Sequence, residues 1–229
     1  MKSPIVFQDL EKELQPVTKY LQGRVLNAGC GQRDLSSFFI KNGATVVDNC
    51  DLTTPIPNAI ICDLVDVPKE SGTYDAILCN AVLEHVQFPD RVVAELRRLV
   101  KPGGYLVLCI PFLQPYHPKP DYRRYTKEGM LELARIHDLE PVEILPVHTI
   151  AQTLTWIYWS YLEERRARLT RLALWGPLYL WNRFSQKTDF DTQIQANGFQ
   201  MVVRKADHSS NGNGHSNGNG HHASNGVTQ

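Results

Sequence analysis

The sequence lacks a long hydrophobic run, a net charge and closely spaced cysteines. No apolar run reaches the roughly 20 residues that a membrane-spanning helix needs. Its 24 basic and 24 acidic residues balance, so no global field attracts nucleic acid. The N-terminal stretch MKSPIVFQDLEKEL holds one short apolar segment before acidic residues begin, which predicts no signal peptide.

The cysteines are five, an odd number, and most lie in or beside apolar runs that are typical of strands. This usage predicts reduced core residues in a cytoplasmic protein. They are Cys30, Cys50, Cys62, Cys79 and Cys109.

Short apolar runs alternate with amphipathic segments from Arg24 to about Val147, the pattern of βαβ units. We therefore expect an α/β fold with a Rossmann-like, seven-stranded, mostly parallel sheet, helices on both faces and an antiparallel last strand. The expected strands are 24–28, 44–50, 59–62, 74–80, 105–110, 139–147 and 198–205.

Capping and breaking residues predict where the helices lie. Asp34 is expected to cap a helix that ends at Asn42-Gly43, and Thr126 a helix over 127–137. A helix with apolar residues at helical spacing follows Arg91, and the KPGG sequence at 101–104 is expected to break it.

The chain divides into a domain over 1–205 and a tail over 206–229. The tail repeats Asn, Gly, Ser and His, and this composition predicts disorder. Its four histidines offer weak metal binding as the alternative to a plain solvated extension.

The glycine loop VLNAGCG, with Gly29 and Gly31, follows the first expected strand and lets a nucleotide-like ligand approach the backbone. A dinucleotide site would have a third glycine at position 34, where Asp34 would repel a pyrophosphate. The loop therefore favours a nucleoside cofactor without phosphate, of which S-adenosylmethionine is the common one. Asp51 is the expected ribose ligand, and Asp48 competes with it.

Several motifs in order resemble the class I S-adenosylmethionine-dependent methyltransferases, in the small-molecule branch that includes ubiquinone and menaquinone biosynthesis enzymes. They are VLNAGCG, Asp51, CDL at 62–64, YDAILCNAVLEHV at 74–86 and LRRLVKPGGYLVLCIPF at 96–112. The resemblance implies that Gly29 and Gly31 underlie the methionine and ribose and that Asp51 binds the ribose hydroxyls. It further implies that Asp63 and Leu64 contact the adenine and that Asn80 and Ala81 line the sulfonium end. The structural alternatives are a plain tight turn at the glycines and a turn cap at Asp63.

Two positions depart from the family pattern. Asn27 stands where an acidic residue is usual, and Arg33 where a glycine is usual. Asn27 supplies no negative charge against a cationic ligand, so a non-catalytic cofactor-binding protein is the first alternative function.

Candidate catalytic residues follow the fourth and fifth expected strands. His85 is a candidate base, although Glu84 and His85 could equally shape the loop. Relatives with a Glu-x-x-Glu-His metal motif have a glutamate where Ala81 stands, so no metal is expected. In PFLQPYHPKPDYRRYT, His117, Asp121 and Tyr125 are candidates to face the acceptor, whereas Asp121 with Arg123 or Arg124 could instead pin the loop.

All four tryptophans fall between Ile150 and Asp191, in an insertion expected over about 150–190 as two helices separated near Gly176-Pro177. Three roles remain open for this insertion. It could pack on the sheet or form a homodimer contact, cover a hydrophobic acceptor as a lid, or contact a membrane surface through 150–185. The leading hypothesis is methyl transfer to an oxygen or carbon atom of a small or lipid-linked acceptor, in a cytoplasmic protein that could associate with membranes. An RNA or protein methyltransferase is the remaining alternative, and the neutral charge argues against RNA.

Overall fold

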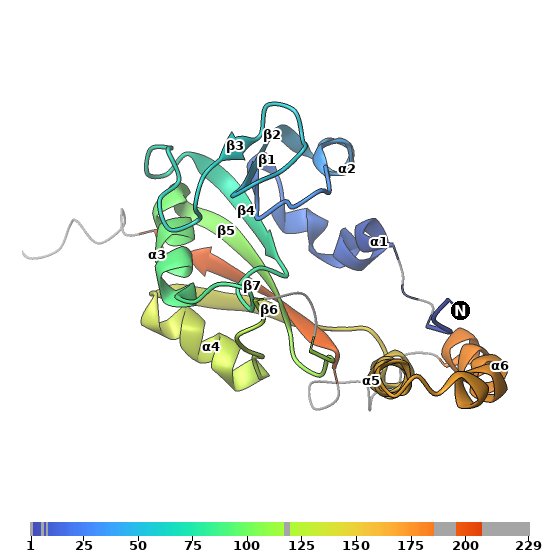
Figure 1. Ribbon diagram of the computed structural model, residues 1–229. Coiled ribbons are helices and arrows are strands. Elements are labelled where there is room, and N and C mark those ends of the chain that lie inside the picture. Colours follow the sequence, from blue (N-terminus) through green and yellow to red (C-terminus); the bar gives the residue numbers. More distant parts are fainter. Residues whose placement is uncertain (1, 6, 8, 117–119, 186–195, 208–229) are drawn as a thin grey trace, which may run out of the picture.

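The computed structural model describes residues 2–5, 7, 9–116, 120–185 and 196–207. Its centre is a twisted sheet of seven strands, which Figure 1 shows between its covering helices. The strand order is β3-β2-β1-β4-β5-β7-β6. The strands are β1 Gly23–Ala28, β2 Ala44–Asp51, β3 Ile60–Ile61, β4 Tyr74–Asn80, β5 Val100–Pro111, β6 Leu139–Val147 and β7 Gly198–Lys205.

Strands β1 to β5 pair in parallel, whereas β7 runs antiparallel to both β5 and β6. The expected sheet, including its antiparallel last strand, is confirmed. Because β1, β2 and β4 are parallel neighbours, the loops that follow them open at one edge of the sheet, where ligands bind in open α/β folds.

Helices cover both faces of the sheet, as expected. On one face α3 (Pro89–Leu99) and α4 (Lys127–Ile136) pack over a core that includes Leu96 and Met130. On the other face α1 (Leu10–Leu14), the 3-10 helix η1 (Gln15–Tyr20) and α2 (Ser36–Lys41) cover a core that includes Leu14 and Phe39.

One of the capping and breaking predictions was wrong. The helix α3 does end at Leu99, directly before the KPGG sequence, although β5 already begins at Val100 and Gly104 fits closely against the Asp75 carbonyl. Asp34 does not cap its helix at the N-cap position, which is Leu35; its Oδ1 instead accepts from the Ser36 N–H at 2.9 Å. Thr126 does cap α4, accepting from the Gly129 N–H at 3.1 Å.

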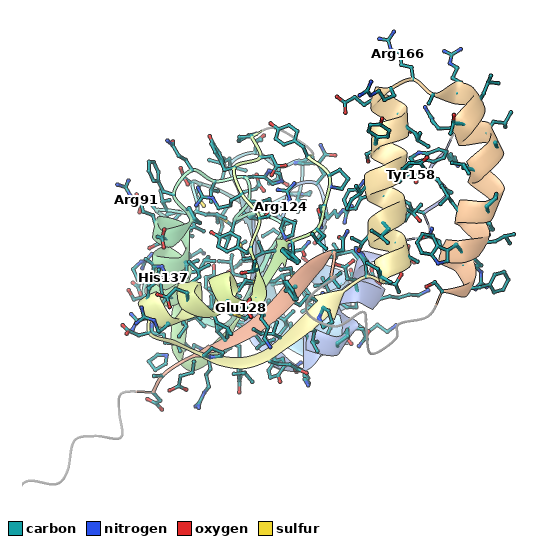
Figure 2. The ribbon with its side chains drawn as sticks, turned by 90° about the horizontal axis from the view of Figure 1, so that it is seen from below. Arg91, Arg124, Glu128, His137, Tyr158 and Arg166 are labelled. Carbon is teal, nitrogen blue, oxygen red and sulfur yellow. The ribbon has the colours of Figure 1, made fainter. Side chains whose placement is uncertain are left out.

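The insertion forms a hairpin of α5 (Ile150–Glu164) and α6 (Arg168–Phe184) that stands beyond the sheet (Figure 2). The expected break at Gly176-Pro177 is wrong, because both residues lie inside α6. The break is at Arg166, which has a left-handed backbone with φ of 53°. Bonds from Arg166 N to Glu163 O and from Ala167 N to Leu162 O close a Schellman-type cap there, so a non-glycine residue ends the helix. No helix in the described part of the chain is long and apolar enough to cross a membrane.

Candidate functional site

The glycine loop leaves β1 with two glycines in the left-handed region. Gly29 has φ of 71°, and a Cβ there would lie 2.3 Å from Val82 Cγ2, so the position excludes a side chain. Gly31 has φ of 56°, and a Cβ there would meet no atom within 4 Å. The first glycine is thus required by packing, whereas the second leaves open space beside the backbone.

Asp51 lies against this loop at the end of β2. Its Oδ2 accepts from the Gly31 N–H at 2.8 Å and its Oδ1 from the Thr53 N–H at 3.1 Å. Asp48, three residues earlier, is instead paired with Arg24, with Nη2 at 2.8 Å from Oδ2. The structure therefore brings Asp51, and not Asp48, into contact with the glycine loop.

Asn27 is buried at the end of β1 and belongs to a polar chain. Its Nδ2 donates to Asn49 Oδ1 at 2.9 Å, and Asn49 Nδ2 approaches Asp34 Oδ1 at 3.3 Å. The Ser36 hydroxyl and N–H hold the pKa of Asp34 below its usual value. Asn27 itself is neutral. The negative charge beside the end of β1 therefore comes from Asp34, the last residue of the hydrogen-bonded series Asn27–Asn49–Asp34.

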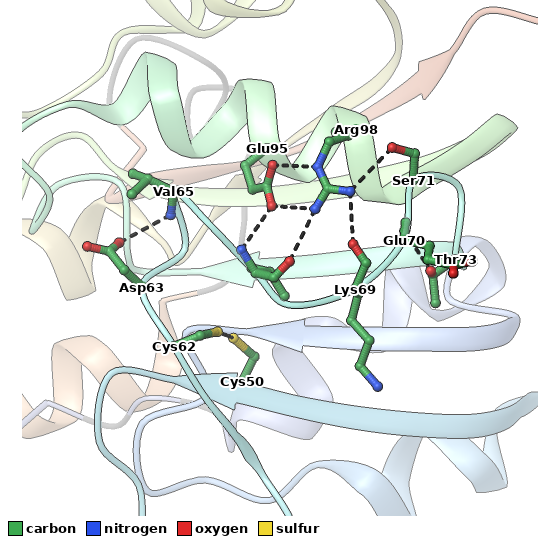
Figure 3. A network of polar contacts seen from close by, with 11 residues as sticks. Cys50, Cys62, Asp63, Val65, Lys69, Glu70, Ser71, Thr73, Glu95 and Arg98 are labelled. Carbon is green, nitrogen blue, oxygen red and sulfur yellow. Dashed lines mark hydrogen bonds and ion pairs between the residues drawn. The ribbon is translucent and has the colours of Figure 1, made fainter.

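Asp63 and Leu64 follow the short strand β3. Asp63 is exposed and its Oδ1 accepts from the Val65 N–H at 3.1 Å, as Figure 3 shows, whereas Leu64 is buried in the core. Beside them the free thiols of Cys50 and Cys62 lie 2.7 Å apart, and burial raises the pKa of both. Among the described residues the cysteines are all free, as expected.

Asn80 and Ala81 lie at the end of β4, and together with Glu84 they line a small cavity of about 80 Å³. Ala81 has φ of 54°, and its N–H donates to the Cys109 carbonyl at 2.9 Å. Glu84 is fully buried, and neither carboxylate oxygen has a hydrogen-bond partner. Burial raises the pKa of Glu84. A buried carboxyl group that accepts no hydrogen bond is thus held beside the end of β4.

His85 lies between Glu84 and the loop after β5, and it is not among the residues that line the small cavity. Its Nδ1 lies 2.5 Å from the Pro120 carbonyl oxygen, and its Nε2 lies 3.7 Å from Glu84 Oε1. His117 lies outside the described residues.

Arg124 holds the loop after β5 in place, because its guanidinium pairs with Asp121 and donates to the Pro115 carbonyl at 3.0 Å. Within the described residues, no cluster of three or more side chains could hold a metal ion.

A second cavity, of about 550 Å³, lies beside the first and was not expected from the sequence. The two share Glu13, Val147 and His148 among their lining residues. His148 Nε2 lies 3.1 Å from Glu13 Oε2, and its Nδ1 lies 3.0 Å from Asn197 Oδ1. No sequence pattern links these residues, since Glu13 and His148 come from opposite ends of the domain. His148 also has φ of 65°, the kind of outlier that clusters at functional sites.

The comparisons agree with this architecture. The family described as "Methyltransferase domain" matches residues 6–203, and the chain belongs to that family. The ubiquinone biosynthesis O-methyltransferase of Burkholderia multivorans is 30% identical over 154 residues. That match covers 53% of this chain and 66% of the relative, so the chain spans slightly less than two thirds of the relative's length.

Solved structures show the same fold at low identity. The 1,6-didemethyltoxoflavin-N1-methyltransferase of Burkholderia thailandensis, crystallised with S-adenosylhomocysteine, has a TM-score of 0.56 and 17% identity, covering 86% of this chain and 80% of that one. A putative sarcosine dimethylglycine methyltransferase from Galdieria sulphuraria has a TM-score of 0.55 and 13% identity, with coverages of 90% and 92%. The chain therefore has the class I methyltransferase architecture that its motifs predicted.

Proposed function

We propose that this chain is an S-adenosylmethionine-dependent methyltransferase that methylates an oxygen or carbon atom of a small or lipid-linked acceptor. The observation that carries the proposal is the contact between the Asp51 carboxylate and the Gly31 N–H, at the sheet edge of a methyltransferase-family domain. A carboxylate at the end of the second strand suits ribose hydroxyls.

The residues at this edge fit a nucleoside without phosphates. The open space over Gly31 leaves room for a ligand, and Asp34 places a negative charge where a pyrophosphate would need a positive one. In this proposal Gly29, Gly31 and Asp51 hold the methionine and ribose, and Asp63 with Leu64 holds the adenine. Asn80 and Ala81 line the sulfonium end of the cofactor. Asn27, whose side chain donates to Asn49, lies beneath the glycine loop. The cofactor supplies an activated methyl group, so the protein mainly has to align an acceptor.

We propose that the acceptor enters through the larger cavity and reaches the smaller one, because both share Glu13 and His148 and the smaller one also contains Asn80 and Ala81. His85 is the proposed base. Its Nδ1 faces the Pro120 carbonyl oxygen, which only accepts, so in this proposal Nδ1 donates to that oxygen and Nε2 takes the proton of an acceptor hydroxyl. His117 remains a proposed second contact to the acceptor.

Binding and turnover together test this function. S-adenosylhomocysteine should raise the melting temperature, and NAD should not. Methyl-labelled cofactor should transfer its label to one member of a panel of phenolic and lipid-linked acceptors. Tight binding of NAD, with no shift from S-adenosylhomocysteine, would refute the proposal.

A non-catalytic cofactor-binding protein is the second candidate, and the absence of a carboxylate at Asn27 favours it. It predicts the same melting shift with no transfer of label to any acceptor. An RNA-directed enzyme would instead bind RNA with a strong dependence on salt.

A further inference from the structure

The α5–α6 hairpin exposes an unusual amount of apolar surface. Of the twenty large hydrophobic side chains that are exposed in the described part of the chain, nine belong to these two helices. They are Leu154, Ile157, Tyr158, Tyr161, Leu169, Leu172, Leu180, Trp181 and Phe184. The proposed methyl transfer uses none of them, so this surface needs another explanation.

The exposed apolar residues of α5 form a stripe that borders α6. Leu154, Ile157, Tyr158 and Tyr161 follow the spacing of one helix face, and all four are exposed. With Leu178 and Trp181 of α6 they line an apolar groove of about 520 Å³. Figure 2 shows Tyr158 midway along the hairpin, beyond the sheet and its covering helices. An amphipathic helix normally turns such a stripe toward a core, so this one is built to meet a surface outside the domain.

The hairpin also concentrates positive charge in a chain whose net charge is zero. Residues 150–184 contain five arginines and two glutamates, and no lysine or aspartate. Glu163 is already engaged, with Arg171 Nη2 at 3.2 Å and the Trp159 indole N–H at 3.1 Å from its Oε1. Arg166 and Arg168 are exposed at the turn between the helices, where Figure 2 labels Arg166 at the far tip.

We propose that the α5–α6 hairpin docks on the surface of an anionic membrane. Exposed tyrosine and tryptophan beside arginine is the composition of interfacial membrane contacts, in which apolar side chains enter the headgroup boundary and arginines meet anionic lipids. A second copy of this chain is the weaker occupant, because it would cover the apolar groove but would pair one arginine-rich hairpin with another and supply no anionic partner for the arginines.

The hairpin begins next to the cavities of the proposed active site. Gln152 of α5 and Asn182 and Arg183 of α6 line the larger cavity together with His148. Docking through the hairpin would hold this cavity near the membrane, where a lipid-linked acceptor resides. The proposed docking surface goes beyond the proposed methyl transfer, and the two proposals are tested by separate measurements.

Vesicle binding tests the proposal, and tryptophan fluorescence reports on the hairpin alone, because Trp156, Trp159, Trp175 and Trp181 are the only tryptophans of the chain. The full chain should sediment with vesicles of phosphatidylglycerol and phosphatidylcholine but hardly with phosphatidylcholine alone. Its emission should shift to the blue on binding, and high salt should weaken the binding.

Two variants, each with a matched control, assign the binding to the hairpin. Arg166→Glu with Arg168→Glu should lower the partition coefficient at least about tenfold, since each charge near such a surface contributes on the order of fivefold. The control reverses the same charge at exposed sites elsewhere, Lys41→Glu with Arg91→Glu, and should have a much smaller effect.

For the apolar face, Ile157→Asp should abolish the blue shift, whereas Ile136→Asp at an exposed site on α4 should not. All variants should keep the melting shift with S-adenosylhomocysteine, which shows that the domain is folded and separates this test from the proposed function. Absence of binding to anionic vesicles would overturn the proposal, as would equal effects of the variants and their controls. A dimer in solution that Ile157→Asp dissociates would also overturn it, in favour of the second copy.

Discussion

Replacing each loop glycine with alanine separates packing from ligand binding. Both Gly29 and Gly31 have positive φ, so alanine at either position costs about 1–2 kcal/mol for the left-handed backbone. At Gly31 nothing lies within 4 Å of the new Cβ, so we expect no further cost to folding. At Gly29 the new Cβ would lie 2.3 Å from Val82 Cγ2, and overpacking adds about 1–3 kcal/mol.

Urea denaturation of the two variants should therefore show Gly29→Ala to be the less stable, by about the overpacking cost. Val82→Ala provides the control. In the Val82→Ala background, Gly29→Ala should cost no more than Gly31→Ala, because the clashing methyl group is gone.

Ligand binding should show the opposite order. The Gly31→Ala methyl group enters the open space that we assign to the cofactor, so S-adenosylhomocysteine should bind at least about tenfold more weakly, the loss of one well-placed contact. If Gly31→Ala kept its affinity, the loop would not contact the ligand. If Gly29→Ala were no less stable than Gly31→Ala, the packing argument would be wrong.

Two further results are expected. Asp51→Ala should abolish the melting shift with S-adenosylhomocysteine. Asp48→Ala, which breaks only the ion pair with Arg24, should retain that shift. The reverse result would assign the ribose site to Asp48. Burial raises the folded-state pKa of Glu84 above its ordinary 4.5. At a pH between 4.5 and this raised pKa, the native state therefore holds more protons than the unfolded state. The free energy of unfolding should accordingly fall as the pH rises through that window. Urea denaturation at pH 5 and pH 8 measures this pH dependence, and Glu84→Gln should reduce it. An unchanged pH dependence would show that another group titrates.

Much of the fold was predictable because its signals are local. Alternating apolar runs place β4, β6 and β7 at the residues where the structure has them, and Thr126 caps its helix as its sequence position suggests. Local signals failed where a tertiary contact competes. Asp34 meets the side-chain amide of Asn49 on β2 and is not the N-cap of α2. The hairpin turns at Arg166, which has no turn signal of its own, while Pro177 stays inside α6.

By itself the sequence determined the order of the strands along the chain, the glycine loop and the carboxylates that follow the second and third strands. Tertiary structure alone decided which carboxylate meets the loop, since Asp48 and Asp51 differ only in whether Arg24 or Gly31 lies opposite. It alone joined Glu13 to His148 and left the stripe of α5 exposed. Those contacts link residues that are distant in the chain, and their distances are set only when the sheet closes and its helices pack.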